Sequence, residues 1–283
     1  MSTRAFDCVV LDFDGTFTEV DREGEPFLAG YRDDLLAQLG GRSADAWARA
    51  EARVLSNPAE FGWEYEGRIV APSNADPYIR ATSIAQIVLD EAGYDPSKRT
   101  DVLQSLYRSN YARASVVFRE HAKETLEQLI ASDIPTFVVT NSHTDAVQQK
   151  LRTLNPKGVD TLPVFGDAQK FVVCESEAPT PEFDALPETL TVGGLSRPLF
   201  LRRGRYFDVL RRVWAESGAT PARTLICGDI FELDLAMPAT LGVSTELITR
   251  PSTPAYEREA ARGFSGGGVA ESLDALLERA LAK

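Results

Sequence analysis

The stretch Val9-Val10-Leu11-Asp12-Phe13-Asp14-Gly15-Thr16 decides the fold of this chain. Its apolar start, from Cys8 to Leu11, is typical of a buried strand in a parallel sheet. Ligands of such sheets bind just beyond the carboxyl ends of the strands, which is where Asp12 and Asp14 follow. Two carboxylates this close repel each other, so they require a divalent cation, a shared proton, or each in turn. The alternative is that Asp14 and Gly15 simply form an acidic turn.

A second acidic motif follows another apolar run, Thr224 to Cys227. Gly228-Asp229 ends this run, and Asp234 comes five positions after Asp229. Mg²⁺ is a hard ion that takes a few carboxylates and keeps several waters, so carboxylates from two neighbouring strand ends suit it. The alternative is the acidic start of a helix, where the helix dipole favours negative charge.

Three further apolar runs predict strands. The first, Ile134 to Val139, ends in Thr140 and Asn141, which could contact a ligand or cap a turn. The others are 161–165 and 245–249. Helical spacing at 122–130, 144–154 and 206–216 separates the strands, and a loop at 263–268 leads to a last helix. Alternation of this kind predicts an α/β fold with a parallel sheet.

In their order along the chain, these motifs resemble those of the haloacid dehalogenase (HAD) superfamily, whose first motif is Asp-x-Asp-Gly-Thr. The resemblance implies a Rossmann-like parallel sheet of strand order 3-2-1-4-5, flanked by helices, with an all-helical cap inserted after the first strand. It implies that Asp12 is the nucleophile and Asp14 the acid/base. It further implies that the Thr140 hydroxyl contacts phosphoryl oxygens, with the Asn141 backbone beside it.

The resemblance also implies the cofactor and the activity. Mg²⁺ would bind Asp12, Asp229 and the backbone carbonyl of Asp14, and Asp234 would bind it through water or lie just behind these ligands. The implied activity is hydrolysis of a small phosphomonoester through an aspartyl-phosphate, since a helical cap would exclude macromolecules. A phosphomutase uses the same motifs, and a HAD-like domain could also be a non-catalytic binding module. The retained Asp14 argues against the dehalogenases and phosphonatases of the superfamily, which lack that residue.

The family also requires a cationic residue, and its position in this sequence departs from the usual pattern. Lys170 follows the strand at 161–165 and is our first candidate. The family's lysine, however, normally begins the helix before the fourth strand, and here Arg202-Arg203-Gly204-Arg205 precedes that helix. One of these arginines is therefore the alternative source of the cation, and we expect Arg202 to bind the substrate. The residues between, 171–199, predict an extra loop or a hairpin that pairs 170–175 with 199–203.

The motifs divide the chain into domains. Residues 1–18 and 116–283 form the expected α/β core, and residues 19–115 predict a helical insert without strands. Asp76-Pro77 and Asp95-Pro96 each predict a helix N-cap followed by the first turn, and Ser43 could cap another helix. The aromatic stretch 61–68 could be a specificity loop, although burial of its rings is the commoner outcome.

Composition restricts the classes of partner. The net charge of −12 argues against nucleic acid and against an anionic membrane surface. No apolar stretch approaches the 18 residues of a membrane span, and the N-terminus is not a signal peptide. The three cysteines are odd in number and widely spaced, which indicates free thiols in a reducing compartment. We therefore expect a cytoplasmic protein.

Overall fold

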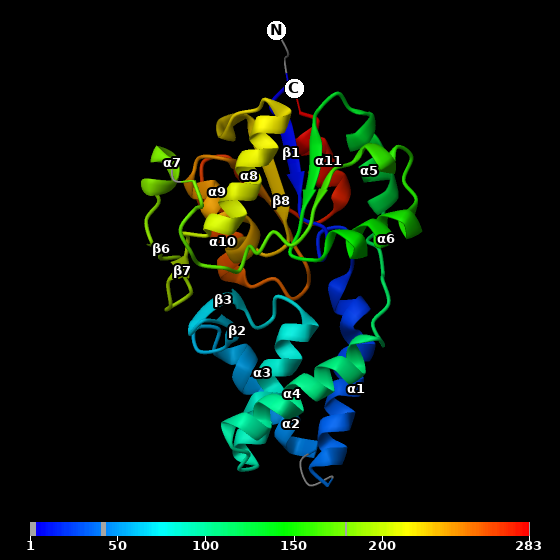
Figure 1. Cartoon of the computed structure of the whole chain (residues 1–283), viewed down its shortest axis with the longest axis vertical. Coiled ribbons are helices and arrows are strands. Elements are labelled where there is room, and N and C mark those ends of the chain that lie inside the picture. The colour runs from blue at the N-terminus through cyan, green and yellow to red at the C-terminus, as the bar shows by residue number, and fades with distance from the viewer. Residues whose placement is uncertain (1–3, 41–43, 179, 283) are drawn as a thin grey trace. The chain divides into compact units, whose positions relative to one another are not determined.

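The computed structural model describes residues 4–40, 44–178 and 180–282. The chain forms two compact units, one of residues 1–18 and 118–283 and one of residues 19–117. We call the first the core unit and the second the insert (Figure 1). The predicted cap at Ser43 lies outside the described residues. Within the described ranges, no helix is long and apolar enough to cross a membrane.

Six parallel strands form the sheet of the core unit, in the order β10-β9-β8-β1-β4-β5. They are β1 (Cys8–Leu11), β4 (Thr136–Val139), β5 (Val164–Phe165), β8 (Thr224–Gly228), β9 (Ser244–Ile248) and β10 (Gly267–Ala270). The five expected strands therefore lie in the predicted order, and the Rossmann-like fold is confirmed. This order places the ends of β1, β4 and β8 side by side.

The sixth strand corrects the loop that we predicted at 263–268. Gly267 and Gly268 pair with Thr245 and Glu246 of β9. Backbone hydrogen bonds form this pairing, and glycines carry none of the β-branched side chains by which a strand is recognised in a sequence.

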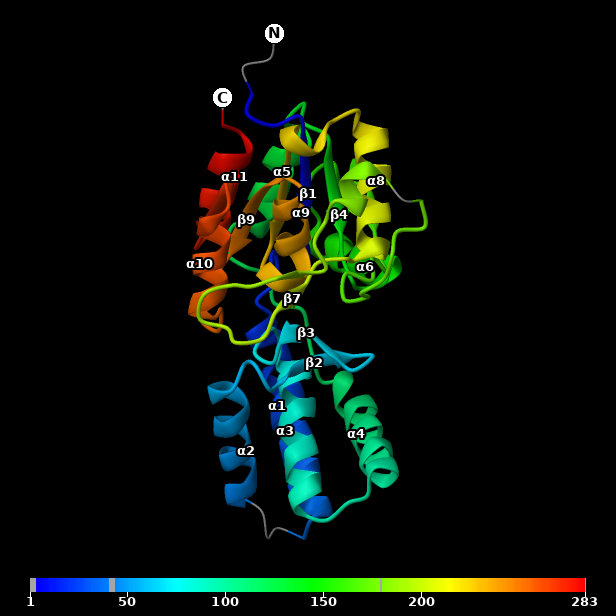
Figure 2. The same cartoon turned by 90° about the vertical axis from the view of Figure 1, so that its left-hand side faces the viewer.

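Helices cover both faces of the sheet, as Figure 2 shows with α8 on one side and α10 and α11 on the other. The helices of the core unit are α5 (Ala122–Ala131), α6 (Thr144–Leu154), α7 (Pro181–Asp184), α8 (Gly204–Ser217), α9 (Ala236–Thr240), α10 (Ala255–Gly263) and α11 (Leu273–Ala280). Leu126 of α5 and Leu276 of α11 join Val9 and Leu11 of β1 in one buried apolar cluster. All four residues of β1 are buried, which explains why its sequence is an unbroken apolar run.

The insert is mainly helical, but the prediction that it lacks strands is wrong. Its helices are α1 (Val20–Gln38), α2 (Ala44–Ser56), α3 (Pro77–Glu91) and α4 (Pro96–Tyr111). Between α2 and α3, the strands β2 (Gly62–Tyr65) and β3 (Arg68–Pro72) form an antiparallel hairpin. Its turn, Glu66 and Gly67, has positive φ at both residues (48° and 74°), the backbone of tight hairpin turns.

The predicted N-caps of the insert are confirmed. The Asp76 carboxylate accepts a hydrogen bond from the backbone N–H of Ile79, at 2.7 Å. The Asp95 carboxylate accepts from the N–H groups of Ser97 and Lys98, both at 3.1 Å. A separate apolar core, which includes Phe27, Tyr31, Leu35, Ile84 and Val88, holds the insert together.

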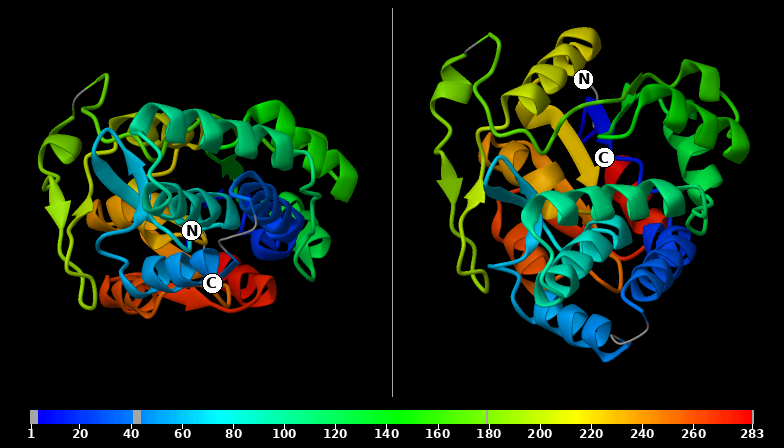
Figure 3. Two further views of the ribbon diagram at one scale, coloured as in Figure 1. Left: turned by 90° about the horizontal axis from the view of Figure 1, so that it is seen from below. Right: turned by 60° about the horizontal axis from the view of Figure 1, so that its bottom comes forward.

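The segment 171–199 contains α7 and one strand of a short hairpin, but not the hairpin that we predicted. The observed pair is β6 (Thr189–Leu190) with β7 (Leu199–Phe200). Residues 170–175 do not pair antiparallel with 199–203; Cys174 instead forms an isolated parallel bridge with Arg203. The yellow-green ribbon of this segment runs along one margin of the core unit in both views of Figure 3.

Candidate active site

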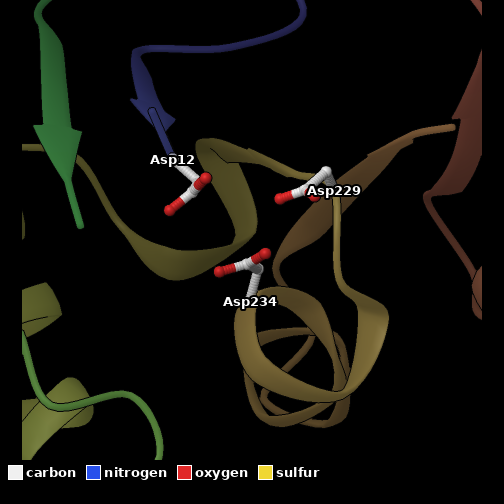
Figure 4. A group of neighbouring side chains, drawn as sticks. All are labelled: Asp12, Asp229 and Asp234. Carbon is white, nitrogen blue, oxygen red and sulfur yellow. The ribbon is translucent and has the colours of Figure 1, made fainter. Parts of the chain in front are cut away.

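Three buried carboxylates lie together beyond the ends of β1 and β8. Asp12 follows β1, Asp229 follows β8, and Asp234 lies in the π-helical turn Phe231–Leu235. One carboxylate oxygen of each lies within 4.8 Å of those of the other two. Figure 4 shows the three side chains turned toward a common point. Their exposed fractions are 8%, 2% and 3%, so water screens these charges poorly.

Close backbone approach explains the glycines of both acidic motifs. Gly15 has φ of +83°, and a Cβ at this position would lie 2.2 Å from Oδ2 of Asp229. A Cβ on Gly228 would lie 2.4 Å from Cβ of Asp234. Only glycine therefore lets the loop after β1 and the end of β8 approach these two aspartates.

Lys170 supplies a buried positive charge between two of the carboxylates. Its ammonium donates to Oδ1 of Asp12 at 2.7 Å and to Oδ1 of Asp234 at 2.8 Å. Burial by itself would lower the pKa of Lys170, but the charges of Asp12 and Asp234 outweigh it and raise the pKa. Lys170 therefore remains an ammonium, and it is the candidate cation that the geometry places at Asp12.

The backbone of Lys170 is held from two directions. Its N–H donates to Oδ1 of Asn141 at 2.7 Å, and its carbonyl accepts from the Arg203 guanidinium at 2.5 Å. Asp167 and Gln169, just before it, have φ of 52° and 48°, a conformation that costs energy for residues other than glycine. The side chain of Asn141, whose backbone we expected beside the phosphoryl group, is thus engaged in positioning Lys170.

Arg203 belongs to a buried ionic network behind the site. Burial lowers the pKa of Arg203 to about 10, although the nearby Glu232 opposes this effect. Arg197 donates to both carboxylate oxygens of Glu232, at 2.8 and 2.7 Å. Glu232 lies in the same π-helical turn as Asp234. The network therefore connects the segment 171–199, the backbone of Lys170 and the turn that carries Asp234.

Arg202 does not lie at the site, which corrects its predicted role in binding the substrate. Its guanidinium pairs with Glu175 and donates to the carbonyls of Phe183 and Leu186, at 3.2 and 3.0 Å. The guanidinium of Arg203 is instead buried and donates to the carbonyl of Lys170, so the two neighbouring arginines have different partners. Arg203 for its part supports Lys170 and does not replace it.

Two arginines that we did not predict complete the site. Arg250 forms an ion pair with Asp229, with 2.8 Å between Nε and Oδ2. Arg119 donates twice to the carbonyl of Gly15, at 3.0 and 2.7 Å, and once to that of Thr249, at 3.1 Å. Arg250 directly follows the end of the fifth predicted strand, and this position was the signal that could have identified it.

The pKa values of Asp12 and Asp229 show that burial disfavours the charged forms of these carboxyl groups. Burial raises the pKa of Asp12 well above its usual range, against the attraction of Lys170. Burial raises the pKa of Asp229 to about 7, against the attraction of Arg250. A divalent cation would supply positive charge, and carboxylate oxygens are ligands that Mg²⁺ prefers. The three residues therefore fit a divalent metal ion.

Thr140 and Asp14 lie in two loops that contact each other. Thr140 is buried, and its hydroxyl accepts a hydrogen bond from the N–H of Ser142 at 3.1 Å, so it stabilises the turn after β4. The Asp14 carboxylate accepts from the Ser142 hydroxyl at 2.6 Å and from the Lys150 ammonium at 2.7 Å. Lys150 is another residue that we did not predict, because no motif marks a lysine in the middle of α6.

Comparisons with known proteins show the fold. No family model matches the chain, and no curated protein matches its sequence. A magnesium-bound HAD hydrolase of Bacillus subtilis is 15% identical, over 97% of this chain and 98% of that one, with a TM-score of 0.53. A HAD family hydrolase of Deinococcus radiodurans R1, with bound phosphate and sodium, is 16% identical over 99% of both chains, with a TM-score of 0.52. A predicted phosphoglycolate phosphatase of Haemophilus somnus 129PT is 15% identical, over 98% of this chain and 99% of that one, with a TM-score of 0.50.

The similar structures also include a dehalogenase with a TM-score of 0.50. At these identities the likeness establishes the fold, and the resemblance to the HAD superfamily is confirmed at that level. The fold is therefore that of the HAD hydrolases, in which both phosphatases and dehalogenases occur. The chemistry of this chain has to be argued from its own site.

Proposed function

We propose that this protein is a Mg²⁺-dependent phosphohydrolase that acts on a small phosphomonoester through an aspartyl-phosphate. One observation carries the proposal: the ammonium of Lys170 lies between Asp12 and Asp234, with Asp229 in the same cluster. A buried nucleophilic carboxylate beside a fixed cation suits phosphoryl transfer, which depends on positioning and on stabilising negative charge.

Each residue of the site has a role in this proposal. Asp12 attacks phosphorus and forms a covalent acyl phosphate as the bond to the leaving oxygen breaks. Asp14 gives its proton to that oxygen and then takes a proton from the water that hydrolyses the intermediate. Lys170 compensates the negative charge beside Asp12, and Thr140 and the Asn141 backbone line the place of the phosphoryl group.

Mg²⁺ would be held by Asp12, Asp229, the backbone carbonyl of Asp14, and Asp234 directly or through water. When bound, it would supply positive charge to the phosphoryl oxygens. The fit rests on the cluster of buried carboxylates and on the raised pKa values of Asp12 and Asp229.

The free cysteines Cys8, Cys174 and Cys227 support the inferred cytoplasmic location.

Asp14 favours a phosphatase over a dehalogenase. The dehalogenases of the superfamily lack this second aspartate, because they need no acid to protonate a departing halide. The Asp14 carboxylate is engaged by two polar side chains, Ser142 and Lys150, which supports a functional role more than a solvated turn.

The test is phosphate release from a panel of small phosphomonoesters, with Mg²⁺ or with EDTA. We expect the wild type to release phosphate only with the metal, and Asp12→Asn to release none. Asp7→Asn is the matched control, since Asp7 is exposed and pairs with Arg223 at the other end of β1. This control should keep wild-type activity.

Other results would contradict the proposal or redirect it. A folded wild-type protein that releases phosphate from no ester, or that releases it equally with EDTA, would contradict it. Phosphorylation of Asp12 followed by transfer to a second sugar phosphate, without phosphate release, would instead indicate a phosphomutase. Tight binding of a phosphate ester without turnover would indicate a binding module.

A further inference from the structure

Lys150 contacts Asp14, and neither the sequence motifs nor the comparisons assign it a role. Its ammonium lies 2.7 Å from Oδ1 of Asp14, and the hydroxyl of Ser142 lies 2.6 Å from Oδ2. Each oxygen of the Asp14 carboxylate therefore accepts one short hydrogen bond. Two donors on two different oxygens restrict both the position of the carboxyl group and its rotation about the last side-chain bond.

Both donors come from the same part of the chain. Ser142 follows β4 by three residues, and Lys150 lies in the second turn of α6. The start of α6 is itself fixed, because the Thr144 hydroxyl accepts from the N–H of Gly166 at 3.1 Å. The side chains of Lys150 and Asp14 are each about a quarter exposed (26% and 25%), so the contact is neither fully buried nor freely solvated.

A general acid is efficient only when its proton lies within reach of the leaving oxygen. Asp14 follows β1 in a turn, and such a segment does not by itself fix a side chain. From this geometry we propose that Lys150 is a positioning residue: its ammonium holds Oδ1 of Asp14, so that the acid form carries its proton on Oδ2, where the Ser142 hydroxyl can turn to accept it or the leaving oxygen can take it. The inference rests on the proposed phosphohydrolase function.

The dependence on the leaving group tests this role. An alkyl phosphate has a poor leaving group and needs the acid, whereas 4-nitrophenyl phosphate has a good one and needs it little. General acid catalysis contributes about 10²- to 10⁴-fold, so misplacing the acid in Lys150→Met should lower kcat/KM for the alkyl ester by about 10- to 100-fold. The value for 4-nitrophenyl phosphate should fall less than about threefold.

Two controls separate positioning from other effects. Arg152→Met removes a cation from the same helix, where Arg152 is exposed and donates to the side chain of Gln149, and it should leave the rates with both substrates unchanged. Lys150→Arg keeps a donor and should recover part of the loss. An equal loss on both substrates in Lys150→Met would mean that Lys150 supports the site in general or binds phosphate directly, and would overturn the proposal.

A double-mutant cycle is a second test of whether Lys150 acts through Asp14. In the Asp14→Asn background the acid is already lost, so adding Lys150→Met should have no further effect on the alkyl ester. A further loss of the same size as in the wild type would overturn the proposal, because Lys150 would then act without Asp14.

The contact itself is measured without substrate. The melting temperatures of Lys150→Met, Asp14→Asn and the double variant should be non-additive, with the double variant more stable than the two single losses predict. Additive losses would overturn the inference whether or not the protein proves to be a phosphatase. If the cycle shows coupling and no ester is turned over, the proposed function fails while the Lys150–Asp14 contact stands.

Discussion

Replacing Lys170 with methionine removes the ammonium that lies 2.7 Å from Asp12 and 2.8 Å from Asp234. Methionine fills a similar volume, so the loss is mainly one of charge. Only 1% of Lys170 is exposed, and the two carboxylates would remain buried without their counter-ion. Breaking a buried ion pair by removing one partner costs about 3–5 kcal/mol.

This loss converts into a shift of the melting temperature. A core unit of roughly 180 residues has an unfolding entropy of about 0.4 kcal/mol per kelvin near 60 °C, so the expected decrease is about 8–13 °C. The assay is thermal unfolding in EDTA, followed by circular dichroism. Lys157→Met serves as control, because Lys157 is exposed, and it should change the melting temperature by no more than about 1 °C.

The same variant should lose activity for a second reason. A fixed charge beside the reacting group contributes about 10²- to 10³-fold to kcat, so Lys170→Met should retain at most about 1% of wild-type turnover. A variant that melts with the wild type would refute the energetic argument. A variant that keeps its turnover would show that another cation compensates the charge at Asp12.

Three further outcomes follow from the site. Gly15→Ala should lose at least about tenfold in kcat, because the new Cβ would lie 2.2 Å from the Asp229 carboxylate and the backbone has positive φ. The control is Gly242→Ala, which also has positive φ but no atom within 4 Å of the new Cβ. It should keep its activity despite a backbone strain of about 1–3 kcal/mol. Arg202→Ala should keep kcat/KM within about twofold of the wild type, since the partners of Arg202 are Glu175 and the carbonyls of Phe183 and Leu186 and not the carboxylates of the site; a large loss of activity would restore Arg202 to the site. In EDTA, the folded pKa of Asp229 is about 7 against a model-peptide value of 3.8, so the folded state binds more protons between these values. The free energy of unfolding should therefore fall as pH rises from about 4 to 7, by at most about 1.4 kcal/mol per pH unit, and a denaturation series should show a shallower fall in Asp229→Asn.

The two acidic motifs could be identified from the sequence because their requirements are local. An apolar run that ends in aspartates predicts a buried strand and the place where its carboxylates emerge, and in each motif a glycine stands directly beside an aspartate in the sequence. The N-caps at Asp76 and Asp95 are local in the same sense, since each side chain bonds a backbone group two or three residues away. The α/β sheet and the grouping of Asp12, Asp229 and Asp234 follow from such signals.

The missed elements depend on backbone geometry and not on side-chain patterns. The β2–β3 hairpin forms through a turn in which Glu66, a residue that seldom adopts positive φ, precedes Gly67. The edge strand β10 contains two glycines, and its partner β9 is separated from it by α10. None of the missed strands, β2, β3 and β10, shows the regular alternation of apolar and polar residues from which strands are predicted.

The sequence by itself determined which carboxylates follow the buried strands, because this property depends on residues close together in the chain. Only the tertiary structure decided which cation meets which carboxylate. Lys170 is 158 positions from Asp12, and Lys150 is 136 positions from Asp14. The partner of a long cationic side chain depends on how loops from different strands pack, as the different partners of the neighbouring Arg202 and Arg203 demonstrate, and no local pattern records that packing.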